Sequence, residues 1–158
     1  GYSTEGNTIK LTMIKCGTYP NAEADIGNHK FTYSLMGHVG NFRDAGVINE
    51  AYALNQPMYA TEIAKHDGNL NDNFSLVSSD KNNVIVETVK KEENGNGMIV
   101  RMYEAFDCRT TAEITVADGF KKAYLCDLME NELSELELKD NKVSIPVSNF
   151  EIITLKFK

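Results

Sequence analysis

The stretch from residue 84 to residue 106, VIVETVKKEENGNGMIVRMYEAF, decides the fold of this chain. From Val84 to Val89 the side chains divide into two alternating sets, the period-two pattern of a β-strand. The turn Glu92–Gly97 contains Asn-Gly pairs, which tolerate the positive φ angles of hairpin turns. We therefore expect an antiparallel hairpin with a second strand from Met98 to Phe106.

Short alternating runs continue beyond this hairpin, as is typical of a β-sandwich. Ala112, Ile114 and Val116 share one face while Glu113 and Thr115 share the other, so one side of this sheet is expected to face water. Turns are expected at 118–119 and 140–141, where Asp-Gly and Asp-Asn occur. The predicted strands span 111–117, 121–127, 136–138, 142–147 and 150–157. Residues 74–158 are thus predicted to form a small C-terminal β-sandwich.

The first sixty residues contain fewer elements. We expect strands at 8–15 and 30–36, separated by a long loop at 17–28, and a helix near 42–54 with Asn41 as its N-cap. Two strands are too few to close an independent sheet, so residues 1–62 are expected to need strands from sequence outside this chain. The open sheet edge predicts edge-to-edge pairing into a homo-oligomer. Polar residues at 63–73 indicate a junction.

Composition excludes several classes of function. The net charge of -7 and the scattered positions of the 16 basic residues argue against a nucleic-acid surface. No apolar run approaches the length of about 18 residues that a membrane span needs, and the opening residues do not resemble a secretion signal. Cys16, Cys108 and Cys126 are odd in number, which favours reduced, buried thiols in a cytoplasmic protein.

One long stretch resembles a known family. Residues 18–35 read TYPNAEADIGNHKFTYSL and continue as MGHVG. This is similar to the late β region of the bacterial-type α-mannosidases of glycoside hydrolase family 38, with Gly37 where that family has Pro. Four later pieces resemble the terminal sandwich of the family in the same order: 83–91, 99–105, 128–133 and 150–156. The resemblance covers most of the chain.

The resemblance implies an all-β fold in which residues 1–62 are the end of the family's large β-sandwich domain. It also implies a division of labour. In family 38 the nucleophilic Asp, the acid/base carboxylate and the ligands of a divalent metal, commonly zinc, lie in an N-terminal catalytic domain that no segment here matches. The parent enzyme would hydrolyse terminal α-mannosides with retention. This chain would then be an inactive C-terminal scaffold packed against the catalytic domain, with no catalytic residue, metal ligand or cofactor of its own.

The loop at 17–28 and the residue after it gather the potential ligands Glu23, Asp25 and His29, with Tyr19 nearby. A divalent cation takes carboxylate and imidazole ligands, but this spacing fits no established metal motif, so a solvated acidic loop is the simpler interpretation. A third interpretation comes from the resemblance: Tyr19, Asp25 and His29 could stand at the rim of the parent's mannoside pocket.

Other polar residues have ordinary structural interpretations. His38 could act as a general base, but no nucleophile accompanies it, and a backbone hydrogen bond at a strand end is the alternative. Arg101 and Glu104 are predicted to form ion pairs on a sheet surface. The rival function is a free-standing sugar-binding or interaction module. Sugars usually stack on aromatic rings, yet Trp is absent and the aromatic residues fall mostly in strand patterns typical of a core.

Overall fold

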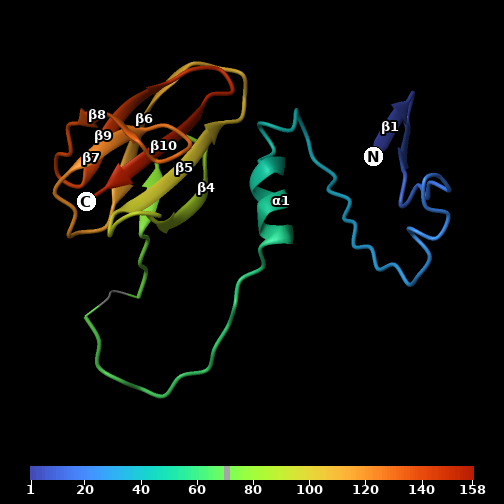
Figure 1. Cartoon of the computed structure of the whole chain (residues 1–158), viewed down its shortest axis with the longest axis horizontal. Coiled ribbons are helices and arrows are strands. Elements are labelled where there is room, and N and C mark those ends of the chain that lie inside the picture. The colour runs from blue at the N-terminus through green and yellow to red at the C-terminus, as the bar shows by residue number, and fades with distance from the viewer. Residues whose placement is uncertain (70–71) are drawn as a thin grey trace. The chain divides into compact units, whose positions relative to one another are not determined.

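The computed structural model describes residues 1–69 and 72–158, and it divides into two units, residues 1–58 and residues 59–158 (Figure 1). The junction predicted at 63–73 includes residues 70 and 71, which lie outside the described residues. Each unit is described separately below.

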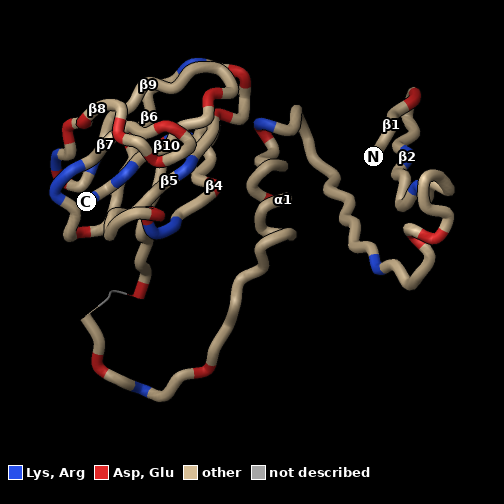
Figure 2. The backbone as a smooth tube through the Cα atoms, in the orientation of Figure 1, with Lys and Arg blue, Asp and Glu red and all other residues tan. Residues whose placement is uncertain are grey.

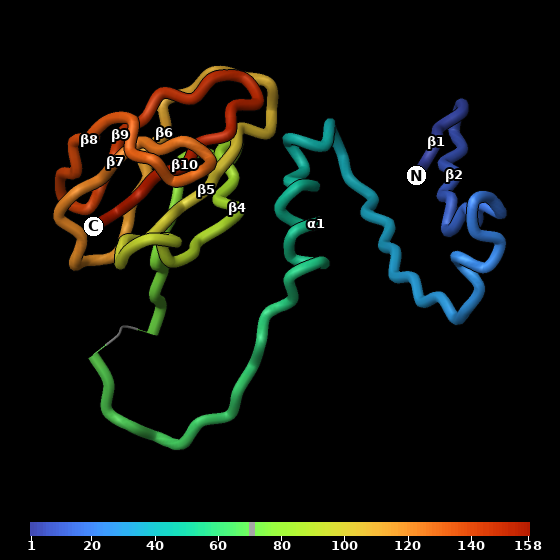
Figure 3. Tube along the Cα trace, in the orientation of Figure 1, coloured from blue at the N-terminus to red at the C-terminus, as the bar shows by residue number. Residues whose placement is uncertain are grey.

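The second unit is an antiparallel β-sandwich, which confirms the predicted all-β fold class. One sheet has three strands, in the order β3 (Val77–Ser79), β6 (Thr110–Val116) and β9 (Lys142–Val147). The other has five, in the order β4 (Val84–Lys91), β5 (Met98–Glu104), β10 (Ile152–Phe157), β7 (Ala123–Cys126) and β8 (Glu132–Leu136). The last strand of the chain therefore lies at the centre of the larger sheet, as the trace in Figure 3 shows.

Alternate residues of the two sheets point inward and form one core. Val100, Ile114, Leu155 and Phe157 have no measurable exposure. Each such side chain contributes about 1.5–3 kcal/mol relative to an exposed position. Phe120 packs against Phe157 with ring centroids 5.8 Å apart, and so covers one end of the core. The other buried core residues are Val84, Met98, Met102, Ala112, Val116, Ala123, Val143, Ile145, Val147 and Ile153.

The strand boundaries follow the predictions closely, with three differences. A β-bulge between Val86 and Thr88 shifts the register of the predicted hairpin. The strand predicted at 136–138 is instead β8, which ends at Leu136. Strand β3, which has three residues, was not predicted. Gly119, Asp140 and Asn141 have φ angles of 113°, 50° and 63°, as their predicted turns require.

The first unit contains a hairpin and one helix. Strand β1 (Tyr2–Glu5), which was not predicted, pairs with β2 (Thr8–Leu11), and β2 stops four residues before the predicted end at residue 15. The strand predicted at 30–36 is absent, because no described segment pairs with its backbone and a strand exists only through such pairing.

Helix α1 (Val47–Asn55) is shorter than the helix predicted at 42–54. Gly46 adopts left-handed angles, φ 66° and ψ 25°, which a continuous right-handed helix excludes. Asn41 therefore caps a preceding turn: its side-chain oxygen accepts hydrogen bonds from the backbone N–H groups of Arg43 and Asp44 at 2.8 and 3.1 Å.

Burial differs sharply between the units. Every residue from 1 to 58 is exposed or half-buried, whereas the second unit has a fully buried core. Among the described residues, no helix has the length and apolar character required to cross a membrane.

Candidate functional site

The loop at 17–28 holds two of the predicted rim residues, Tyr19 and Asp25, and His29 follows it directly. Tyr19 is 91% exposed. The Nε2–H of His29 donates to the backbone carbonyl of Asp25 at 2.8 Å, so the imidazole closes the loop through the main chain rather than through a carboxylate. The same ring stacks on Phe31 with centroids 6.1 Å apart. The structure thus brings Asp25 and His29 together, and within the described residues no hydrogen bond links Tyr19 to them.

The metal interpretation of this loop gains no support. Across residues 1–69 and 72–158, no group of three or more His, Cys, Asp and Glu side chains is placed to hold an ion. Glu23 takes part in a local turn, in which its backbone N–H donates to the side chain of Asn21 at 3.0 Å. The donor set present in the described residues therefore does not fit a zinc site.

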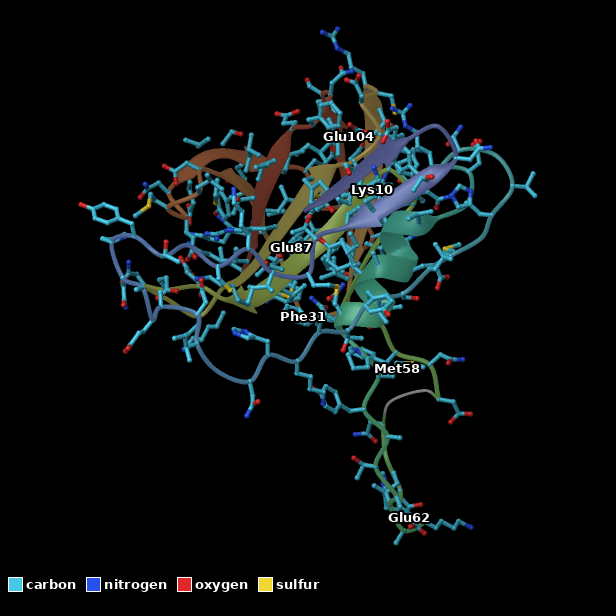
Figure 4. The ribbon with its side chains drawn as sticks, turned by 90° about the vertical axis from the view of Figure 1, so that its right-hand side faces the viewer. Lys10, Phe31, Met58, Glu62, Glu87 and Glu104 are labelled. Carbon is cyan, nitrogen blue, oxygen red and sulfur yellow. The ribbon has the colours of Figure 1, made fainter. Side chains whose placement is uncertain are left out.

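The first of two polar clusters that the sequence did not reveal surrounds Glu104. Its predicted place on a sheet surface is wrong: the residue is 1% exposed, at the end of β5 (Figure 4). One carboxylate oxygen accepts from the Asn83 amide and the Phe106 N–H, both at 2.8 Å. The other accepts from the Phe150 N–H at 3.0 Å. The prediction failed because the turn that precedes β10 folds over this strand end.

Burial raises the pKa of Glu104, but its hydrogen bonds act in the opposite direction and prevail. Donation by the Phe150 N–H, the Asn83 amide and the Phe106 N–H stabilises the ionised carboxylate and lowers its pKa to about 2. A carboxylate held in this state is a poor proton donor at neutral pH. Its hydrogen bonds instead hold together the chain segments that contain Asn83, Phe106 and Phe150.

The second cluster lies on the outer face of the five-stranded sheet, where Figure 2 shows residues of both signs interspersed over the sandwich. Lys156, in β10, is 4% exposed, and its ammonium lies 2.7 Å from Glu92 and 3.4 Å from Glu132. The hydrogen bond from Lys156 lowers the pKa of Glu92. Glu92 also accepts the Gly97 N–H at 3.0 Å, so it closes the turn between β4 and β5.

Glu130 extends this network toward β4. It is 7% exposed, accepts the Glu93 N–H at 2.9 Å, and lies 2.8 Å from the ammonium of Lys90. Arg101 lies 3.7 Å from the same carboxylate and donates to the Leu128 carbonyl at 2.7 Å. The ion pair predicted for Arg101 is therefore present, although it joins a buried carboxylate.

A hollow of about 230 Å³ lies beside this network, lined by Glu92, Glu130, Glu132 and Lys156 together with Asn94, Met129 and Asn131. Lys156 pairs with Glu92 and Glu132, whereas Glu130 pairs with Lys90 and Arg101, which do not line the hollow. Lys156 lies 64 positions from Glu92 along the chain, so only the folded topology reveals the pair. The sequence signal was a lysine inside the apolar run of the last strand.

The cysteines were predicted to be buried, and two are not. Cys16 and Cys108 are exposed, whereas Cys126 is buried, and all three are free thiols. Burial raises the pKa of the Cys126 thiol, which makes it a weaker nucleophile at neutral pH. His38 is also exposed and lies outside the strands.

Comparison with known proteins defines the class. Residues 83–155 match the family model described as the glycosyl hydrolases family 38 C-terminal beta sandwich domain. The match runs from the residue before β4 into β10, and so spans most of the sandwich. The second unit is therefore a C-terminal sandwich of this family.

Whole-chain relatives extend the assignment to the first unit. The chain is 34% identical to alpha-mannosidase 2C1 of Homo sapiens and 36% identical to alpha-mannosidase G of Dictyostelium discoideum, over 98% and 99% of its own length. It is 23% identical to alpha-mannosidase of Saccharomyces cerevisiae. The chain spans only 15% of the length of the first two relatives and 16% of the third. It belongs to glycoside hydrolase family 38, as a C-terminal β region of the α-mannosidase type.

Proposed function

We propose that this chain is the non-catalytic C-terminal β portion of an α-mannosidase that hydrolyses terminal α-mannosides with retention. The observation that carries this proposal is the alignment of both units, 98–99% of the chain, with proteins named as α-mannosidases that are several times longer. The chain would act as scaffold: it would pack against the catalytic domain of the longer protein and take part in its oligomerisation.

The hydrogen bonds that the buried carboxylates accept support a structural role for this chain. A retaining glycosidase needs two carboxyl groups about 5–5.5 Å apart, one of them free to attack the sugar. In the sandwich, Glu104, Glu92 and Glu130 each accept hydrogen bonds from backbone or side-chain donors that hold turns in place. The nucleophile, the acid/base group and a divalent ion, zinc by family resemblance, would all belong to the catalytic domain.

The loop at 17–28 is proposed to form part of the rim of the mannoside pocket in the longer protein. Its side chains are exposed, and the hydrogen bond between His29 and the Asp25 carbonyl gives the loop a defined shape. Replacing Asp25 and His29 by Ala in the longer protein should raise KM for a mannoside. Unchanged kcat and KM would remove this loop from the pocket.

An assay with an aryl α-mannoside tests the main proposal. The longer protein should release the aryl group, and this chain alone should not. Turnover by the chain alone would contradict the scaffold role. Titration with mannose discriminates the alternative of a free-standing sugar-binding module, because saturable binding by the isolated chain would favour that function.

The cellular setting is part of the same proposal. Three free thiols suit a reducing compartment, so we place the protein in the cytoplasm. The acidic balance of the chain suits neither nucleic acid nor an anionic membrane surface as a partner.

A further inference from the structure

Residues 30–36 have the composition of a strand but lack the neighbours of one. Phe31, Tyr33 and Leu35 alternate with smaller polar residues and are 45%, 72% and 87% exposed (Figure 4 labels Phe31). Among the described residues, no backbone hydrogen bond joins this segment to another part of the chain. The pattern of a buried strand is therefore present without the sheet that would bury it.

Helix α1 also lacks the neighbours that would bury its apolar side chains. It has nine residues, none of them buried, and an isolated helix of that length is unstable in water. Leu35 and Met36 line a hollow of about 450 Å³ with Val47, Ala51 and Leu54 of the helix. The segment and the helix thus border one apolar concavity within the first unit.

We propose that residues 30–36 and α1 form one docking surface, and that residues 30–36 enter a β-sheet of the longer polypeptide as an added strand. This inference rests on the proposed function. The occupant is the additional polypeptide of the same protein, because the relatives align with almost the whole chain while about 85% of their own length lies outside the match. One partner would thus supply both the backbone pairing that residues 30–36 lack and the apolar burial that the segment and α1 lack.

The chemistry of the surface favours a permanent contact within one protein. Lys30 and Glu50 are the only charged residues in the segment and the helix. Large, apolar surfaces with few charges are typical of obligate interfaces, whereas transient ones are more polar. An added strand gains main-chain hydrogen bonds, and its alternate side chains select the register. Phe31, Tyr33 and Leu35 would face the apolar core, with Thr32 and Ser34 on the opposite side.

Hydrogen exchange in the longer protein tests the added strand. Peptides that cover residues 29–36 should exchange on the order of 100-fold more slowly in the longer protein than in this chain alone. Peptides from residues 92–97, in a turn of the sandwich, serve as an internal control and should exchange similarly in both. Unprotected amides at 29–36 in the longer protein would overturn the proposal, and so would amides already protected in the isolated chain.

The same experiment distinguishes a second copy of the chain as the occupant. Protection at 29–36 should be independent of protein concentration if the partner is part of the same polypeptide. Protection that disappears on dilution of the longer protein, together with a fall in mass to the monomer, would assign the surface to another copy and overturn the proposal.

A pair of substitutions tests which face is buried. In the longer protein, Tyr33→Asp should lower the melting temperature and release the protection at 29–36, whereas the matched control Thr32→Asp should have a smaller effect on both. If Tyr33→Asp yields no folded protein, Tyr33→Thr is the substitute, because it keeps the strand propensity and removes the ring. It should also lower the melting temperature and the protection at 29–36 more than Thr32→Asp does. Equal effects at positions 32 and 33 would contradict the proposed face.

Hydrolysis of an aryl α-mannoside, measured on the unmodified longer protein, separates this inference from the function on which it rests. Hydrolysis without protection at 29–36 would overturn the proposed docking surface and leave the proposed function standing. Protection without hydrolysis would overturn the proposed function and leave the docking surface supported.

Discussion

The carboxylate of Glu104 joins three segments that are far apart in the sequence. Its donors are Asn83 before β4, Phe106 after β5 and Phe150 before β10. Phe150 has a φ angle of 54°, a left-handed conformation that an aromatic residue rarely adopts, and its N–H is one of the groups that Glu104 holds. One side chain thus fixes the end of the sandwich at which these segments meet.

Replacing Glu104 by Gln should destabilise the sandwich by about 2–4 kcal/mol at pH 7, because it removes a charge-assisted acceptor and leaves buried donors poorly paired. The pKa of Glu104 is about 2 in the folded state against an ordinary 4.5. Its contribution is therefore fully present above about pH 4.5 and is lost as pH falls toward 2.

Chemical unfolding of the two proteins, followed by circular dichroism from pH 7 to pH 2, measures this difference. The free energies of unfolding of wild type and Glu104→Gln should converge below pH 4.5. A gap that does not depend on pH would contradict the role assigned to the ionised carboxylate.

The pair of Lys156 and Glu92 allows a double-mutant cycle. Lys156→Met should cost about 3 kcal/mol in unfolding free energy, because it leaves Glu92 buried without its cation. Glu92→Gln should cost less, since Lys156 keeps Glu132 at 3.4 Å. The double variant should be more stable than the sum of the two single effects predicts. Simple additivity in urea unfolding would show that the two groups do not interact.

At the scale of elements, the turn between β4 and β5 depends on Gly97. A Cβ at this position would lie 2.8 Å from the Glu92 carboxylate and 3.1 Å from the Phe157 carbonyl. Neither neighbour moves easily, since Glu92 is held by Lys156 and Phe157 belongs to the central strand. The Asn-Gly pattern that predicted a turn therefore also reflects close packing.

Gly97→Ala should lower the stability of the sandwich by about 1–3 kcal/mol through this overpacking. Gly68→Ala is the control, because among the described residues its Cβ would meet nothing closer than the His66 ring at 3.9 Å. Thermal melts of both variants provide the measurement. Equal melting temperatures for the two would argue that the turn adapts without cost.

What the sequence could predict depends on how local the physical cause is. Alternation and turn residues predicted the hairpin of β4 and β5, because both signals lie within two dozen residues. The Gly46 break in the helix was partly visible, as glycine is unfavourable inside helices. The buried position of Glu104 and the pairing of Lys156 with Glu92 depend on contacts between distant strands, which no local pattern encodes.

The candidate rim loop shows the same limit. Its Asn, Gly and Pro residues predicted a loop, but the contact of His29 with the Asp25 carbonyl depends on how the backbone turns between them. Residues 30–36 show the converse: the pattern predicted a strand, and the structure shows that this pattern is insufficient where the described part of the chain offers no partner strand.

At the scale of the whole molecule, the two units differ in how stable each can be by itself. The sandwich has a contiguous core, whereas no residue from 1 to 58 is buried. Limited proteolysis of this chain should therefore cut first before residue 74, where residues 1–69 are exposed or half-buried, and leave a resistant product that begins near residue 74. Mass spectrometry identifies the cut sites. Early cleavage within β5 or β10 would contradict the assignment of the stable core.

The central proposal is that this chain supports an α-mannosidase without supplying its reacting groups. The most direct measurement compares the longer protein with a version that lacks these 158 residues, with and without this chain added back. We predict that the truncated protein loses thermal stability and most aryl α-mannoside hydrolysis, and that the added chain restores part of both while being inactive alone. Full activity and an unchanged melting temperature after truncation would contradict the claim.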